Sequence, residues 1–272
     1  IAVAALGAAV PLASSRLESL DGAERATVSA ALWSLWALAL LASWVPSALS
    51  LTALRLCTPA HALVIAVSAV SRAGTSVVVA ATIGLAAAIS TMSSDVGNSF
   101  VQASAYGDER RVLLRCPAVH SVVQVVAGLV WFASAAVGAL ALANGAYPTG
   151  AVLTIVALIG ALFLPSRFHR YSRRWLVAVP AGIVIHDQVV LAETSMFPRR
   201  RITGIDVTAE RGESADLSGG TRGPWIRIVL DDFETVVRAP TPGDPGGTAL
   251  HLRSLLVEPT RLDAGLRALD AR

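Results

Sequence analysis

The chain has 272 residues, of which 54% are hydrophobic and only 15% are charged, and its formal net charge is +3. Soluble domains usually carry about a quarter charged residues, so this composition predicts an integral membrane protein. The small net charge gives no reason to expect nucleic-acid binding, and the two cysteines, Cys57 and Cys116, form no disulfide framework.

Long apolar runs separated by short polar connections make up the first 166 residues. A helix needs about 20 apolar residues to cross a bilayer, and we expect about six such helices here. The expected spans are Thr27–Val45, Leu51–Val70, Thr75–Met92, Pro117–Ala143 and Gly150–Pro165, preceded by the apolar run Ile1–Ala13. With only 13 residues, that first run is interpreted as the end of a helix that begins outside the given sequence; the alternative is that it is not a full span.

The arginines orient these spans. Cytoplasmic connections of membrane proteins carry an excess of basic residues. Eight arginines fall in connections expected inside, and three fall in connections expected outside: Arg55, Arg110, Arg111, Arg115, Arg167, Arg170, Arg173 and Arg174 against Arg16, Arg25 and Arg72. We therefore expect a multi-pass plasma-membrane protein with a cytoplasmic C-terminal domain, and with the polar connection Ser93–Cys116 on the same side.

The stretch Ser166–Trp175, with the sequence SRFHRYSRRW, marks the boundary between two kinds of sequence. Residues 1–166 are predicted to form the transmembrane domain, 167–174 a basic joint at the membrane surface, and 175–272 a separate β domain. After the joint, apolar and polar residues alternate as they do in half-buried strands. The expected strands are Trp175–Val179, Gly182–His186, Val189–Ala192, Ile202–Thr208, Trp225–Leu230, Phe233–Arg238 and Leu250–Val257, and a helix is expected over Thr260–Ala271.

This order of strands closed by one helix resembles the pleckstrin-homology-like (PH-like) domain of many bacterial membrane proteins. The segment WLVAVPAGIVIHD at 175–187, followed by RRRITGIDV at 199–207, is similar to the opening strands of that domain. The whole chain resembles uncharacterised multi-pass membrane proteins of actinobacteria. That resemblance implies the fold class, a membrane helix bundle followed by a mostly-β PH-like domain, and it brings no catalytic or ligand residues with it.

A basic docking surface is the main candidate site. Between residues 167 and 201 the chain has seven arginines and two acidic residues. Anionic headgroups attract each basic residue near the surface by about 1 kcal/mol. The candidate docking residues are Arg110, Arg111, Arg167, Arg170, Arg173, Arg174, Arg199, Arg200 and Arg201. We expect them to contact the inner leaflet or a membrane or cytoplasmic protein.

No metal or cofactor is expected, but two Cys–His pairs are candidate ligands. Cys57 and His61 are four residues apart, as are Cys116 and His120. Residues at this spacing share a helix face, so two such helices could offer a tetrahedral site. The alternative is that each histidine is neutral and bonded to a backbone carbonyl.

No catalytic motif supports an enzyme. The glycine-rich segment Ser218–Gly223 lacks the order of a phosphate-binding loop, and neither G-x-S-x-G nor H-E-x-x-H occurs. Within the spans, Gln124 is the only strongly polar side chain expected at depth, whereas transport paths usually carry buried charge. The preferred hypothesis is therefore a non-enzymatic scaffold, regulator or accessory subunit. The alternative is a transporter or lipid-handling protein that uses the helix bundle itself.

Overall fold

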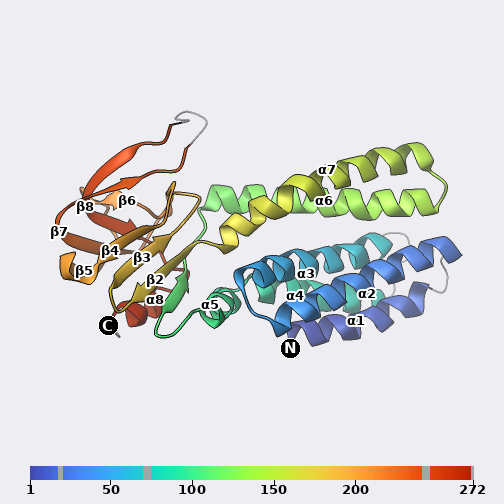
Figure 1. Ribbon diagram of the computed structural model, residues 1–272. Helices are drawn as coiled ribbons and strands as arrows, with labels where there is room; N and C mark the ends of the chain where they lie inside the picture. Colours follow the sequence, from blue (N-terminus) through green and yellow to red (C-terminus); the bar gives the residue numbers. More distant parts are fainter. Residues whose placement is uncertain (18–20, 70–74, 241–245, 271–272) are drawn as a thin grey trace. The chain divides into compact units, whose positions relative to one another are not determined.

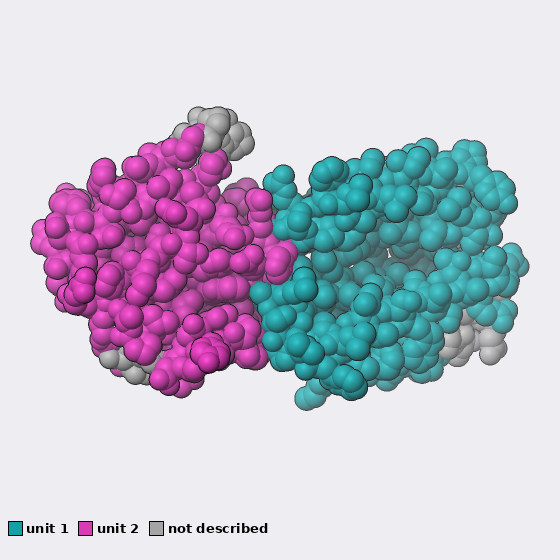
Figure 2. All heavy atoms as spheres, viewed as in Figure 1, with its two compact units in different colours: residues 1–96, 123–168 teal, residues 97–122, 169–272 magenta. Residues whose placement is uncertain are grey.

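The computed structural model describes residues 1–17, 21–69, 75–240 and 246–270, and it divides into two compact units. The first unit consists of residues 1–96 and 123–168, and the second of residues 97–122 and 169–272 (Figure 2). Arg72 lies outside the described residues. The chain passes from one unit to the other three times, where the sequence predicted a single boundary near residue 167.

The first unit is a bundle of apolar helices (Figure 1). It contains α1 Ala2–Leu17, α2 Gly22–Trp44, α3 Ala48–Ala69, α4 Thr75–Met92 and most of α6 Ala118–Ala143 and α7 Tyr147–Ser172. Five of these helices, α2, α3, α4, α6 and α7, are long and apolar enough to cross a membrane, and Ala2–Ala13 forms a shorter apolar helix. This confirms the predicted layout of a membrane helix bundle in the N-terminal half.

Small residues let these helices pack closely, as is usual between membrane helices. At Gly84 in α4, an added Cβ would come within 3.2 Å of the Ala62 backbone in α3. The α6–α7 hairpin is joined by the indole of Trp131, which donates a hydrogen bond of 2.9 Å to the carbonyl of Ala157. Many apolar side chains of α6 and α7 remain exposed, which suits contact with lipid tails.

The second unit contains two four-stranded sheets and a final helix. The first sheet has the order β1-β2-β3-β4, with β1 Arg110–Leu113, β2 Trp175–Val179, β3 Gly182–His186 and β4 Ser195–Pro198. The second has the order β5-β7-β8-β6, with β5 Ile202–Thr208, β6 Ala215–Asp216, β7 Trp225–Val237 and β8 Ala249–Val257. The 3₁₀ turn η1 Arg199–Arg201 joins the sheets, and α8 Leu262–Asp270 packs beside β1, β2 and β7. The core is formed by the inner faces of both sheets, with Ile185, Phe197, Ile226 and Leu255 at its centre.

The strand predictions hold where alternation is regular. β2, β3 and β5 have the predicted bounds, and the two strands predicted over 225–238 form one strand, β7, whose pairing shifts between Val229 and Glu234. The strand predicted at Val189–Ala192 is wrong, because this segment is a turn whose first amide donates to the Asp187 carboxylate. The strand β4 lies further along the chain, at Ser195–Pro198.

The connection Ser93–Cys116 is the largest departure from the sequence expectation. It forms α5 Ser94–Ala103 and strand β1, and β1 pairs with β2 so that Leu113 lies opposite Trp175. On α5, the amide oxygens of Asn98 and Gln102 accept hydrogen bonds of 2.8 Å from the backbone N–H groups of Leu113 and Arg111. These side chains occupy donors on β1, the outer strand of the first sheet, where an unpaired edge would otherwise be exposed.

The predicted joint at residues 167–174 is mostly helical. Helix α7 continues through Pro165 to Ser172, and only two residues separate its end from Trp175 at the start of β2. Likewise, α1 continues past Pro11 to Leu17, where a loop was expected from Ser14 onward.

Candidate docking surface and the buried arginine beside it

The end of α7 carries the first group of predicted docking residues. Arg167 and Arg170 are exposed, and Arg173 is half-buried just after the helix. None of the three forms an ion pair with a carboxylate in the part of the chain that the structure describes. Because they directly follow the apolar part of a candidate span, their charges lie where a membrane-spanning α7 would leave the bilayer.

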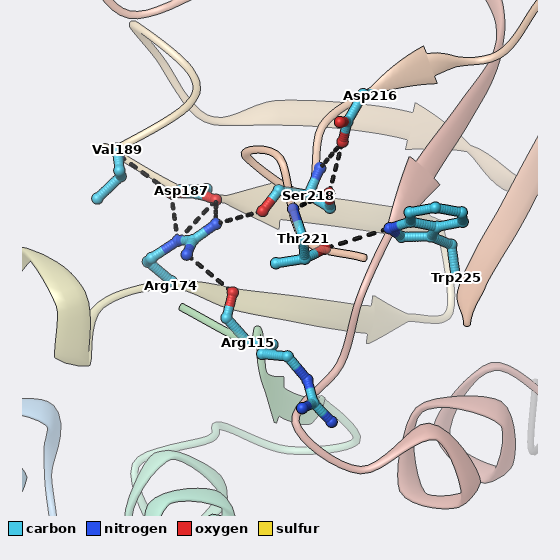
Figure 3. Close-up of polar contacts among 8 residues, drawn as sticks. All are labelled: Arg115, Arg174, Asp187, Val189, Asp216, Ser218, Thr221 and Trp225. Carbon is cyan, nitrogen blue, oxygen red and sulfur yellow. Dashed lines mark hydrogen bonds and ion pairs between the residues drawn. The ribbon is translucent and has the colours of Figure 1, made fainter. Parts of the chain in front are cut away.

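Arg174 differs from its neighbours because its side chain is completely buried. Its Nε lies 3.0 Å from both carboxylate oxygens of Asp187, and its Nη2 lies 2.8 Å from Oδ2 (Figure 3). The same guanidinium donates to two backbone carbonyls, at 2.9 Å to Arg115 and at 3.0 Å to Ser218. The Asp187 carboxylate also accepts a hydrogen bond of 3.0 Å from the Val189 amide.

A buried ion pair is tolerated when its remaining donors and acceptors are satisfied. Here five N–H···O contacts use the guanidinium, and the carboxylate is held by both the arginine and the backbone. Arg174 therefore cannot offer its charge to a lipid headgroup, which corrects its assignment as a docking residue. The sequence missed this role because Arg174 precedes β2 and Asp187 follows β3, so that only the pairing of the two strands brings them together.

The network around Arg174 holds together segments that are distant in the sequence. On β6, Asp216 accepts hydrogen bonds from the backbone amide and hydroxyl of Ser218 in the following loop, and the Trp225 indole donates to Thr221 (Figure 3). The carboxylate of Glu258, after β8, pairs with Arg115 at 2.5 Å.

The network also joins the segment that leads into α6 to the segment that follows α7. Arg115 precedes the start of α6 at Ala118 by three residues, and Arg174 follows the end of α7 at Ser172 by two. The rings of His120 on α6 and Tyr171 on α7 lie 5.9 Å apart, centroid to centroid.

Arg110 and Arg111 lie on β1. The guanidinium of Arg111 pairs with Glu109 at 2.7 Å and lies 5.7 Å from the ring centroid of Trp175. This hydrogen bond from Arg111 lowers the pKa of the Glu109 carboxyl. The positive charge of Arg111 is therefore largely compensated, whereas Arg110 is exposed without an ion pair among the described residues.

The imidazole of His186, on β3, stacks on the ring of Trp175, with the ring centroids 5.0 Å apart. Its Nδ1 lies 2.7 Å from the hydroxyl of Thr194. Burial lowers the pKa of His186, and the nearby charge of Arg173 lowers it further. His186 is thus held neutral at neutral pH.

Arg199, Arg200 and Arg201 lie at the opposite end of the first sheet from the end of α7. In the strand register, Trp175 is opposite His186, whereas Gly182 is opposite Pro198, the residue before η1. At about 3.3 Å per residue, the two ends of β2 are about 13 Å apart. The sequence had grouped these arginines with those of the joint into one basic face, and the sheet register separates the two groups.

The three arginines of η1 also differ in their surroundings. Arg201 forms ion pairs with Asp231 and Glu234, so its charge is compensated. Arg199 and Arg200 are exposed, and neither is ion-paired to a described carboxylate.

A pocket of about 360 Å³ opens next to Arg199. Its walls come from the end of β2, the start of β3, η1, the first half of β5 and the end of α8. The apolar lining includes Ile183, Ile202, Ile205 and Leu269, and Arg199 and Asp270 supply the two charges. The sequence contained no signal for this pocket, because its walls come together only when the two sheets pack.

The candidate metal ligands are divided between the units. Cys57 and His61 lie on α3 in the first unit, and Cys116 and His120 belong to the second. Within the described ranges, no three His, Cys, Asp or Glu side chains are grouped so that they could hold a metal ion.

His61 lies deeper in its helix than the sequence predicted. Helix α3 begins at Ala48, so His61 is about 20 Å along it, at about 1.5 Å per residue, rather than at its inner end. The imidazole is fully buried, and neither ring nitrogen has a hydrogen-bond partner among the described residues. Gln124 is therefore not the only strongly polar side chain within the spans.

Comparison of the chain with models of protein families, with curated proteins and with solved structures finds no match.

Proposed function

We propose that this chain is a multi-pass plasma-membrane protein whose second unit is a cytoplasmic PH-like domain that docks a partner protein. It would act as a scaffold, regulator or accessory subunit and not as an enzyme. The two sheets and closing helix are consistent with a PH-like domain, and the distribution of arginines supports the cytoplasmic side. Arg167, Arg170 and Arg173 would contact anionic headgroups where α7 leaves the bilayer.

The observation that carries this proposal is the way the second unit is built into the chain. Segment 97–122 leaves the helices after α4, supplies α5 and β1, and returns through α6. Arg174, two residues after the end of α7, then donates to the Arg115 carbonyl ahead of α6. A domain tethered by a single linker would transmit little to its helices. Here, a partner bound to the second unit would act on residues that are continuous with three membrane helices.

The test uses the full chain in its native membranes. A photo-crosslinking amino acid is placed at exposed positions of the second unit, Tyr106, Met196 or Phe233, and in control chains at the exposed positions Val126 or Leu158 of the helices. We expect one protein to be captured at near-stoichiometric amounts from the second unit and not from the control positions. A chain that captures no protein there, and that purifies alone with a bound solute or lipid, would refute a docking function.

His61 favours the alternative, a transporter or lipid-handling protein. Ionisable residues inside membrane helices frequently mark transport paths. In α3 and α4, the hydroxyls of Thr58 and Thr91 are hydrogen-bonded at 2.7 Å, and the Arg55 Nε donates to the Thr91 carbonyl at 3.3 Å. The alternative predicts that mass spectrometry of the purified chain finds a small molecule that is lost in His61→Leu and retained in Ala66→Leu, at an exposed position of the same helix. Equal content in both variants would remove this support.

A further inference from the structure

The pocket beside η1 combines an apolar floor with a basic rim. Ile183 and Leu269 are nearly fully buried members of the main core, so the pocket opens directly onto that core. Ile202 and Ile205 of β5 add apolar surface on one side. Burying a large apolar side chain stabilises a complex, so this floor suits an inserted hydrophobic side chain.

The charges at the rim are unequal. Arg199 lines the pocket and Arg200 follows it on the same turn, both exposed and without an ion pair among the described residues. Asp270, at the end of α8, is the one acidic side chain among the described residues of the lining. Arg201 is compensated by Asp231 and Glu234 and adds no charge to the rim. The balance therefore favours an anionic occupant.

Within the second unit, this pocket lies away from the end of α7. Its lining residues Gly182 and Arg199 lie at the end of the first sheet that is about 13 Å, one strand length, from Trp175. The arginines of the α7 end are those that follow a span directly. The pocket and its rim therefore do not share the position of the proposed headgroup contacts.

We infer that the pocket binds an acidic segment of a partner protein, which inserts one apolar side chain between β5 and α8 and places carboxylates on Arg199 and Arg200. This inference rests on the proposed docking function and names the chemistry of the partner. Arginine guanidinium groups bind carboxylates through two parallel hydrogen bonds, which gives direction as well as charge. The apolar floor supplies the remaining affinity and distinguishes this segment from a purely acidic one.

The binding test uses the full chain in detergent micelles and a short labelled peptide that carries one leucine among glutamates. We expect saturable binding that weakens with added salt, because exposed charges are screened. Replacing the leucine by alanine, or the glutamates by glutamine, should each weaken binding. Binding that is unchanged by both peptide substitutions would overturn the inference.

Two variants of the protein address the rim and the floor separately. Arg199→Glu with Arg200→Glu should weaken peptide binding by at least about tenfold, whereas Arg222→Glu with Arg253→Glu, at exposed arginines away from the pocket, should leave it unchanged. Thr203→Trp places a large ring at an exposed lining position and should block the pocket. Val207→Trp, further along β5 and outside the lining, is its matched control. Equal losses in the control variants would contradict a specific site.

A photo-crosslinking residue at Thr203 in native membranes separates this inference from the proposed function. Capture of a protein through an acid-rich segment, abolished by the rim substitutions, is the expected result. Capture of a phospholipid would overturn the inference. If other exposed positions of the second unit capture a partner and Thr203 does not, the pocket assignment fails and the docking function stands. Capture from no position would count against both.

Discussion

Arg174 and Asp187 form a completely buried ion pair in which the guanidinium Nη2 lies 2.8 Å from the carboxylate Oδ2. The pair lies where the chain enters the first sheet from α7, and the same guanidinium also holds the backbone of Arg115 ahead of α6. The pair thus stabilises the interior of the second unit, although its arginine belongs to a sequence motif typical of a membrane edge.

Removing one member of this pair should be strongly destabilising. Asp187→Ala leaves a buried, uncompensated guanidinium, which typically costs about 3–5 kcal/mol. The measurement is denaturant unfolding of the purified chain, followed by the fluorescence of its tryptophans. Arg222→Ala, at an exposed position, should change the free energy of unfolding by no more than about 0.5 kcal/mol.

The double variant Arg174→Met with Asp187→Leu gives the sharper comparison. Replacing both members by apolar residues of similar size is often close to neutral, so the double variant should be more stable than Asp187→Ala. If the double variant loses as much stability as the single one, the backbone contacts to Arg115 and Ser218 matter more than the ion pair.

Asn98 and Gln102 should protect the edge of β1. Asn98→Ala and Gln102→Ala each remove the acceptor for one backbone N–H, at Leu113 and Arg111, and should cost about 1 kcal/mol apiece. Hydrogen exchange measured by mass spectrometry should become faster in the peptide that contains β1. Ala103→Ser, at an exposed position on the same helix, is the control, and unchanged exchange in the two alanine variants would contradict the capping role.

The charges at the end of α7 should determine how many anionic lipids the chain retains. Changing Arg167, Arg170 and Arg173 to glutamine removes up to about 1 kcal/mol of attraction for each. Native mass spectrometry in lipid-containing detergent should then show fewer bound phosphatidylglycerol molecules. Arg199→Gln with Arg200→Gln serves as the comparison and should leave lipid retention unchanged. An equal loss in both sets would show that the two groups of arginines face the same surface.

His186 should make the second unit less stable in mild acid. Burial, with a further contribution from Arg173, lowers the pKa of His186 below its ordinary value of 6.5. The unfolded chain therefore binds a proton at a higher pH than the folded chain does. The contribution of the neutral His186 imidazole to the free energy of unfolding is fully present above pH 6.5 and is lost as the pH falls below that value.

The variant His186→Phe tests this dependence. It keeps a ring against Trp175 and removes the titrating group, so its unfolding midpoint should vary less between pH 7 and pH 5 than that of the parent chain. His251→Phe, at an exposed histidine on β8, should retain the dependence of the parent. A parent chain whose midpoint does not change over this range would show that His186 contributes nothing.

The sequence by itself determined the elements that local pattern controls. The lengths of the apolar runs located the helices that could cross a membrane. The regular alternation of apolar and polar residues located β2, β3 and β5 with their observed bounds. These predictions succeed because the period of a helix or strand is contained within a few neighbouring residues. The positions of the arginines next to the apolar runs likewise needed no structure.

Only the tertiary structure decided which of those arginines are exposed to a binding partner, and how segments of the chain alternate between the two units. Arg174 and Asp187 are 13 residues apart, and the carbonyl of Arg115 that Arg174 holds is 59 residues away, so no window of local sequence contains the network. The same limit hid strand β1, whose partner β2 follows only after two long helices. It also hid the separation of Arg199 and Arg200 from the α7 end, because strand register, rather than distance along the chain, decides which ends of a sheet meet.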